Sequence, residues 1–186
     1  MKSIALYVYT LIVLTVCLLL FSCKKENNST DSNSSAVRVG ESYEGGIVFY
    51  IDGSGQHGLI SASIDQSRAI QWYNGNYSFV NLKDGSVGIG QSNTTTIVGK
   101  QGIGNYAASL CDQLVLNGYN DWFLPSKNEL NLLYQERNQV GGFANAYYWS
   151  SVEYDTVGAW NQYFPFGTQY YADKSSIACV RAIRAF

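Results

Sequence analysis

The residues best suited to chemistry lie near the end of the chain, where aromatic and amide side chains alternate. Tyr and Trp combine an apolar face with a polar edge, which suits sugar rings and hydrated interfaces. The candidates for such a binding surface are Trp160, Asn161, Gln162, Tyr163, Tyr170 and Tyr171. Tyr170 and Tyr171 lie between two expected turns, and adjacent strand residues face opposite ways, so we expect one of them to be exposed. For Trp149 and Trp160, a place in the core is the favoured interpretation.

Residues that would support catalysis are scarce. The only histidine, His57, lies in a Gly-rich stretch, so a Ser-His-Asp arrangement is not expected. A glycosidase needs two carboxylates at a set separation. The sequence alone does not show that any two of the available carboxylates lie at such a separation; they are Asp121, Glu129, Glu136, Glu153 and Asp155. We expect Asp121 to cap a turn rather than bind a cation, since Asp commonly accepts hydrogen bonds from nearby backbone amides.

One motif suggests a nucleotide site. Residues 53–58 spell G-x-G-x-x-G directly after an expected strand. A dinucleotide site requires a helix next, so that its N-terminal amides meet the pyrophosphate. The residues that follow, 59–64, show no helical period, and no βαβ unit comes after them. We therefore predict a hairpin turn here, with His57 on its surface.

The composition excludes several classes of protein. Charged residues make up 14% of the 186 residues and aromatic residues 15%, so most of the chain is not intrinsically disordered. A formal net charge of -2 provides no basic field for a nucleic acid. One His and four Cys cannot build several zinc sites. No metal or other cofactor is expected.

The N-terminus contains an apolar run, from Ile4 to Leu20, that follows Lys2 and leads to Cys23. The run is marginal for a membrane span and resembles a bacterial lipoprotein signal with its lipobox. This resemblance implies that residues 1–22 are removed and that Cys23 carries the acyl chains. Residues 23–36 form a polar tether. The alternatives are an uncleaved anchor or an ordinary signal peptide. The expected location is the cell envelope, lipid-anchored, in the outer membrane of a Gram-negative bacterium.

Two cysteines remain for the mature domain, because Cys17 lies in the signal and Cys23 is expected to be lipidated. In an oxidising compartment Cys111 and Cys179 are a natural disulfide pair. The alternative is two separate buried thiols.

The hydrophobic pattern of residues 37–186 predicts a single α+β domain with short antiparallel strands. A helix is expected over 105–116. A second should begin at Ser126, where Ser126 and Glu129 form a capping box, and end before Gly141. The expected strands are 47–51, 58–62, 147–151, 159–164, 169–171 and 177–184. Residues 71–99 are expected to be mostly irregular loops pinned by aromatic side chains.

These segments together resemble the C-terminal domain family of the Legionella collagen-like adhesin, to which the Fibrobacter major-paralogue domains look related. The motifs that carry the resemblance are Gly118–Leu130, Tyr148–Ser151, Ala159–Gln162 and Val180–Phe186, with Gly45–Ile51 at the start. The resemblance implies a C-type-lectin-like fold, with two helices packed on short antiparallel strands. It also implies a disulfide from the first helix to the last strand, a placement that Cys111 and Cys179 match.

The resemblance implies no catalytic site. The sequence also lacks the motifs of the calcium-dependent sugar site of animal C-type lectins. The residues beside Pro125 and Pro165 differ from those of the lectin motif, and Gln162 stands where that motif has a carboxylate. The first hypothesis is therefore a non-catalytic, adhesin-like module that binds a glycan or another extracellular polymer. The second is a structural or assembly lipoprotein that binds an envelope protein. The third is an enzyme built like the formylglycine-generating oxidases, which would need reactive cysteines.

Overall fold

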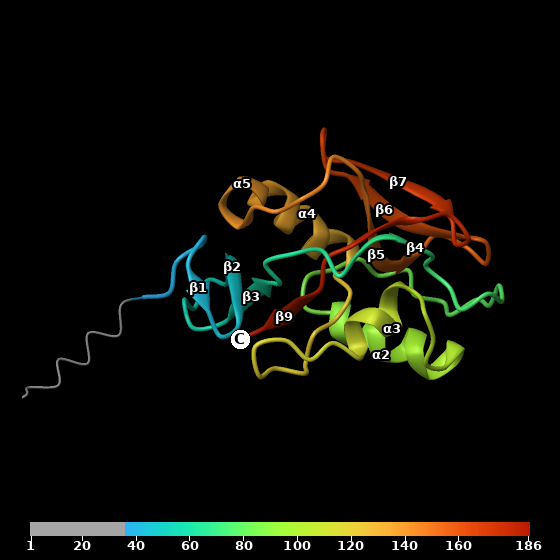
Figure 1. Ribbon diagram of the computed structural model, residues 1–186, viewed down its shortest axis with the longest axis horizontal. Helices are drawn as coiled ribbons and strands as arrows, with labels where there is room; N and C mark the ends of the chain where they lie inside the picture. Colours follow the sequence, from blue (N-terminus) through green and yellow to red (C-terminus); the bar gives the residue numbers. More distant parts are fainter. Residues whose placement is uncertain (1–35) are drawn as a thin grey trace, which may run out of the picture. The chain divides into compact units, whose positions relative to one another are not determined.

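The computed structural model describes one unit of the chain, Ala36–Phe186. The predicted signal, Cys23 and almost all of the tether lie outside these described residues. The unit contains two sheets and several short helices, so the predicted α+β class is confirmed (Figure 1).

The first sheet has the strand order β1-β2-β3-β9. It contains β1 (Ser42–Tyr43), β2 (Gly46–Ile51), β3 (Gly58–Ser61) and β9 (Ile183–Ala185), all antiparallel to their neighbours. The G-x-G-x-x-G stretch forms the turn between β2 and β3, as predicted, with His57 exposed on it. The end of the chain closes this sheet, since Gly58 and Phe186 exchange two backbone hydrogen bonds of 3.1 Å.

The second sheet has the order β4-β8-β5-β6-β7. Its strands are β4 (Ser67–Ile70), β8 (Ala178–Val180), β5 (Tyr147–Glu153), β6 (Gly158–Tyr163) and β7 (Thr168–Asp173). The expectation of purely antiparallel strands was wrong at one point, because β5 and β8 pair in parallel. The strand expected over 177–184 was also wrong. It divides into β8 and β9, which belong to different sheets.

The helices are α2 (Gly90–Gln101), α3 (Ala107–Asp112), α4 (Lys127–Gln135) and α5 (Arg137–Val140). The capping box of α4 is confirmed. The Glu129 backbone N–H donates to Ser126 Oγ at 3.2 Å, and the Ser126 backbone N–H donates to Glu129 Oε2 at 2.7 Å. The helix continues as α5 and ends at Gly141, whose φ of 73° favours glycine.

Helix α2 contradicts the prediction of irregular loops up to residue 99. Its sequence is rich in Gly, Thr and Asn, which have weak helix propensity. Burial of Thr94 and Ile97 compensates for that weakness. The Thr94 hydroxyl also receives a 3.0 Å hydrogen bond from the Leu124 backbone. Local propensity was therefore overridden by tertiary contacts.

Two hydrophobic clusters make up the core. The first surrounds Trp72 and Trp149, which are both fully buried. Their indole N–H groups donate to backbone carbonyls, Trp72 to Ser150 at 2.8 Å and Trp149 to Ile70 at 2.9 Å. The second cluster contains Tyr148, Phe164, the apolar face of α4 and Cys179. Strand β5 therefore contributes alternate side chains to both clusters.

Candidate binding site

The predicted aromatic and amide residues lie on β6 and β7, at the edge of the second sheet (Figure 1). A hollow of about 360 Å³ opens on one face of these strands. The residues that line it come from β5, β6, β7 and the turn after β7, and are Tyr147, Asn161, Tyr170, Tyr171, Ala172, Ser176 and Ile177. The site therefore combines three tyrosines with one amide and one serine hydroxyl.

Tyrosines form the walls of this site. The Tyr147 ring lies 4.6 Å from the Tyr163 ring and 6.2 Å from the Tyr170 ring, measured between centroids. Tyr147 is 40% exposed and Tyr170 is 49% exposed. These rings share a face because Tyr147 pairs with Tyr163 in the ladder, and Tyr170 pairs with Asn161 two positions away. Their apolar faces are thus available to a ligand.

Asn161 lies between these tyrosines and makes an unusual contribution to the site. It is 5% exposed, yet its side-chain Oδ1 has no hydrogen-bond partner among the described residues. Leaving a buried acceptor unsatisfied costs about 1–3 kcal/mol. Such a group in a native fold calls for an explanation, for example an ordered water or a ligand. The hollow that Asn161 lines has room for either.

The opposite face of the same strands carries the other predicted residues. The Gln162 amide N–H₂ donates to Asn131 Oδ1 on α4 and to the Gly167 carbonyl, both at 2.9 Å. Trp160 is half-buried beneath Lys127, whose Nζ lies 3.3 Å from the ring centroid. Partial burial lowers the pKa of Lys127. Helix α4 therefore covers this face at Gln162 and Trp160.

Tyr171 borders the hollow, but its ring also belongs to the opposite face. There it stacks on Tyr154 at a centroid distance of 3.7 Å and an interplanar angle of 8°. The six predicted residues therefore separate into two groups. Asn161, Tyr163 and Tyr170 lie together at the open face. Trp160, Gln162 and the Tyr171 ring lie on the opposite face, where Trp160 and Gln162 pack against α4. The prediction from sequence missed Tyr147, although pairing strand 147–151 with strand 159–164 would have placed it beside Tyr163.

The predicted disulfide between Cys111 and Cys179 is wrong, because both thiols are free and buried. Cys111 on α3 belongs to the first hydrophobic cluster, and Cys179 on β8 belongs to the second. The Cys179 Sγ lies 3.5 Å from the Arg68 carbonyl oxygen, in a separate environment. Burial raises the pKa of both thiols, so neither resembles the thiolate nucleophile of an oxidase.

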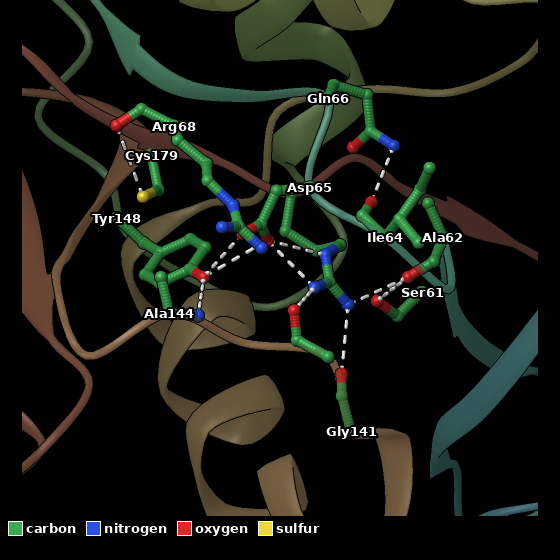
Figure 2. Close-up of polar contacts among 12 residues, drawn as sticks. Ser61, Ala62, Ile64, Asp65, Gln66, Arg68, Gly141, Ala144, Tyr148 and Cys179 are labelled. Atoms are coloured by element: carbon green, nitrogen blue, oxygen red, sulfur yellow. Dashed lines mark hydrogen bonds and ion pairs between the residues drawn. The ribbon is translucent and has the colours of Figure 1, made fainter.

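A buried polar cluster around Asp65 lies where β8 leads into β9 (Figure 2). The Arg181 guanidinium, fully buried, donates to Asp65 Oδ1 at 2.7 Å and to the Gly142 carbonyl at 2.8 Å. The Tyr148 hydroxyl donates to Asp65 at 3.0 Å and accepts from the Ala144 backbone N–H at 2.7 Å. Burial raises the pKa of Tyr148. Every group in this cluster is paired, which indicates a structural role.

Four of the five carboxylates considered for catalysis, all except Glu136, make structural contacts. Asp121 does not cap a turn as expected. Instead, its two oxygens accept from Arg184 at 2.7 and 2.9 Å. Glu129 completes the capping box, and Glu153 forms a 2.6 Å ion pair with Lys174 in which both side chains are fully buried. Asp155 accepts from the backbone of its own turn. Within residues 36–186, no three His, Cys, Asp or Glu side chains gather as a metal site would require.

Comparisons with known proteins agree with this architecture. A fimbrial protein from Bacteroides ovatus, a solved structure, superimposes with a TM-score of 0.52 at 12% sequence identity. The match covers 74% of this chain and 43% of the fimbrial chain, and at this identity it shows a likeness of fold alone. No curated protein was found to match the chain.

In the part of the chain that the structure describes, no helix has the length and apolar character needed to cross a membrane. The family comparison is decisive for identity. The model of the Lcl C-terminal domain matches residues 61–184, more than half of the chain. This confirms the resemblance inferred from the sequence motifs: the chain belongs to the Lcl C-terminal domain family.

Proposed function

We propose that this chain is a non-catalytic binding module of the bacterial cell envelope, and that it holds carbohydrate in the hollow lined by Tyr147 and Tyr170, where Tyr163 packs against Tyr147. The observation that carries the proposal is that the exposed rings of Tyr147 and Tyr170 lie beside Asn161, whose Oδ1 has no partner among the described residues. Sugar rings present apolar C–H faces and hydroxyl groups together. Such a ligand would pack on the rings and hydrogen-bond to the amide.

A non-catalytic role is supported by the contacts and the burial of the side chains that could react. The buried carboxylates are held in ion pairs or in a helix cap, and both cysteines have pKa values raised by burial. His57, exposed on its hairpin turn, belongs to another sheet. We propose that binding needs no calcium, because the hollow is lined without any carboxylate and calcium prefers several anionic oxygens.

The location and the finer fold assignment belong to the same proposal. We propose that Cys23 is lipidated and that residues 23–36 tether the domain to the outer membrane. Membership of the Lcl C-terminal domain family supports a place on the cell surface. The α+β arrangement of two sheets with short helices supports a C-type-lectin-like fold.

A glycan-array screen of the purified chain, run once with calcium and once with a chelator, tests the proposal. We expect selective binding to one class of glycan, retained in the chelator and clearly weakened by Tyr147→Ala or Tyr170→Ala. Binding that disappears in the chelator would contradict the calcium-independent site. A folded chain that binds no glycan would favour an envelope protein as the partner instead.

A further inference from the structure

We infer that the hollow takes an uncharged sugar residue, and that Asn161 selects it by accepting a hydrogen bond from one of its O–H or N–H groups. This inference rests on the proposed function, because it names the class of ligand for the same site. It starts from the one polar side chain of the hollow that is almost completely buried.

The unpaired oxygen defines what the ligand must supply. Asn161 Oδ1 is an acceptor, so only a donor satisfies it. Less than 1 Å² of this oxygen is accessible, so we infer that the amide turns toward the hollow when the ligand binds. The oxygen then regains on binding the hydrogen bond that it lacks in the free protein. The fold tolerates this unpaired acceptor at Asn161, whereas the neighbouring amide of Gln162 is fully paired. Sugar hydroxyls and acetamido N–H groups are donors of the required kind.

The lining of the hollow defines what the ligand must lack. None of its seven residues is Asp, Glu, Lys, Arg or His. The nearest charged residues on β7 and its turn are engaged elsewhere. Asp173 accepts from Tyr77 and Ser175, and Lys174 is buried against Glu153. A carboxylate or sulfate in the hollow would therefore lose its hydration without gaining a cation.

The remaining walls suit an uncharged ring. Ile177, which is 67% exposed, and Ala172 add apolar surface to the lining of the hollow. The Ser176 hydroxyl adds a group that can both donate and accept. A sugar ring would contact Tyr147 and Tyr170, direct one donor to Asn161 and place a methyl or C–H edge against Ile177.

Calorimetric titration of the full chain with four hexasaccharides tests the inference: chitohexaose, cellohexaose and mannohexaose, which are uncharged, and hexagalacturonate, which is anionic. We expect at least one uncharged probe to bind and hexagalacturonate to bind at least tenfold more weakly. Asn161→Leu, which removes the acceptor and keeps the volume, should weaken that binding about tenfold. Asn161→Ala should do the same.

Thermal unfolding separates recognition from structural support. Because Asn161 Oδ1 has no partner to lose, the melting temperature of Asn161→Leu or Asn161→Ala should stay within about 2 °C of the wild type or rise. The matched control is Gln162→Leu, which should lower the melting temperature and leave the affinity of the folded protein unchanged.

The outcomes distinguish this inference from the proposed function. Preference for hexagalacturonate, or unchanged affinity in both Asn161 variants, would overturn the inference and leave a glycan-binding module in place. The inference also fails, with the glycan-binding module intact, if both variants lose several degrees of melting temperature, or if none of the four probes binds while other glycans do. A folded chain that binds no glycan at all would overturn both.

Discussion

Asn161 and Gln162 are adjacent on β6 and carry the same functional group, yet their surroundings differ completely. Gln162 points toward α4, and its amide bonds to Asn131 and to the Gly167 carbonyl. Asn161 points to the opposite face, where its Oδ1 is buried and unpaired beside Tyr147 and Tyr170. One face of the strand is thus completed by the fold, and the other is left incomplete beside a hollow.

This difference separates stability from recognition within a single strand. On the α4 face, the Gln162 amide has its hydrogen-bond partners within the chain. The open face has aromatic rings partly exposed and an amide without a partner. Proteins commonly give up stability at binding sites in this way. The following experiments test whether the two faces behave as differently as their contacts indicate.

The largest effect should come from breaking a fully buried ion pair. Lys174→Met leaves the Glu153 carboxylate buried with only the backbone N–H groups of Val80 and Asn81. We expect a loss of about 3–5 kcal/mol in the free energy of unfolding, measured by urea denaturation. The matched control is Lys127→Met, which also removes a lysine lying over a tryptophan. Because Lys127 is only partly buried, its loss should cost about 1 kcal/mol or less.

The next largest loss of stability should come from the Gln162 amide, which is hydrogen-bonded within the chain. Gln162→Leu strands the Asn131 acceptor and the Gly167 carbonyl without their donor, so the free energy of unfolding should fall by about 2 kcal/mol. Glycan affinity should be unchanged because Gln162 does not line the hollow. A stable Gln162→Leu protein would remove the contrast between the two amides.

The third experiment addresses the open face. Tyr170→Ala removes an exposed ring from the hollow, so glycan affinity should fall about tenfold while the free energy of unfolding changes by less than about 0.5 kcal/mol. Binding is measured by calorimetry and stability by urea denaturation. Tyr43→Ala is the control, since Tyr43 is also exposed but lies on the first sheet. An equal loss of affinity in both variants would contradict the location of the site.

The smallest expected effect is a pH dependence. The Arg184 guanidinium lowers the pKa of Asp121 below its ordinary value near 4. Its contribution to stability is therefore present above about pH 4 and is lost as the pH falls through the lowered pKa. Because the Asp121 side chain is 42% exposed, the amount should be below about 1 kcal/mol. In Asp121→Asn, the free energy of unfolding should fall less between pH 5 and pH 2 than it does in the wild type. An equal fall in both proteins would contradict this assignment.

The sequence predicted elements whose local signals were strong. The capping box located the start of α4, and alternating aromatic residues located β5, β6 and β7. The prediction failed where contacts between residues far apart in the sequence determine the structure. Helix α2 depends on burial of Ile97 and on the hydrogen bond to Leu124, and no local pattern announces either. The division of residues 177–184 between two sheets depends on Arg181, whose partner Asp65 is far away in sequence.

The candidate site was predicted in part for the same reason. Residue type identified Asn161, Tyr163 and Tyr170, but only the strand register assigns them to one face and adds Tyr147. Trp160 and Gln162 have the same chemical character and were equally plausible from sequence. Their contacts with α4 remove them from the open face. The disulfide prediction was wrong because the presence of two cysteines in one oxidising compartment does not place their thiols close together in the fold.

The crossing of the chain from β8 to β9 has a mechanical consequence. Figure 1 shows β1 and the C-terminus at one end of the domain and β7 at the other. A pull between an N-terminal attachment and a ligand held at β7 would therefore load both sheets in series. Only Arg181 and Ala182 separate β8 from β9, and Arg181 is clamped to Asp65 and to the Gly141 and Gly142 carbonyls. Under tension these hydrogen bonds of Arg181 would hold the connection between β8 and β9 in place, so that the two sheets resist separation as one unit.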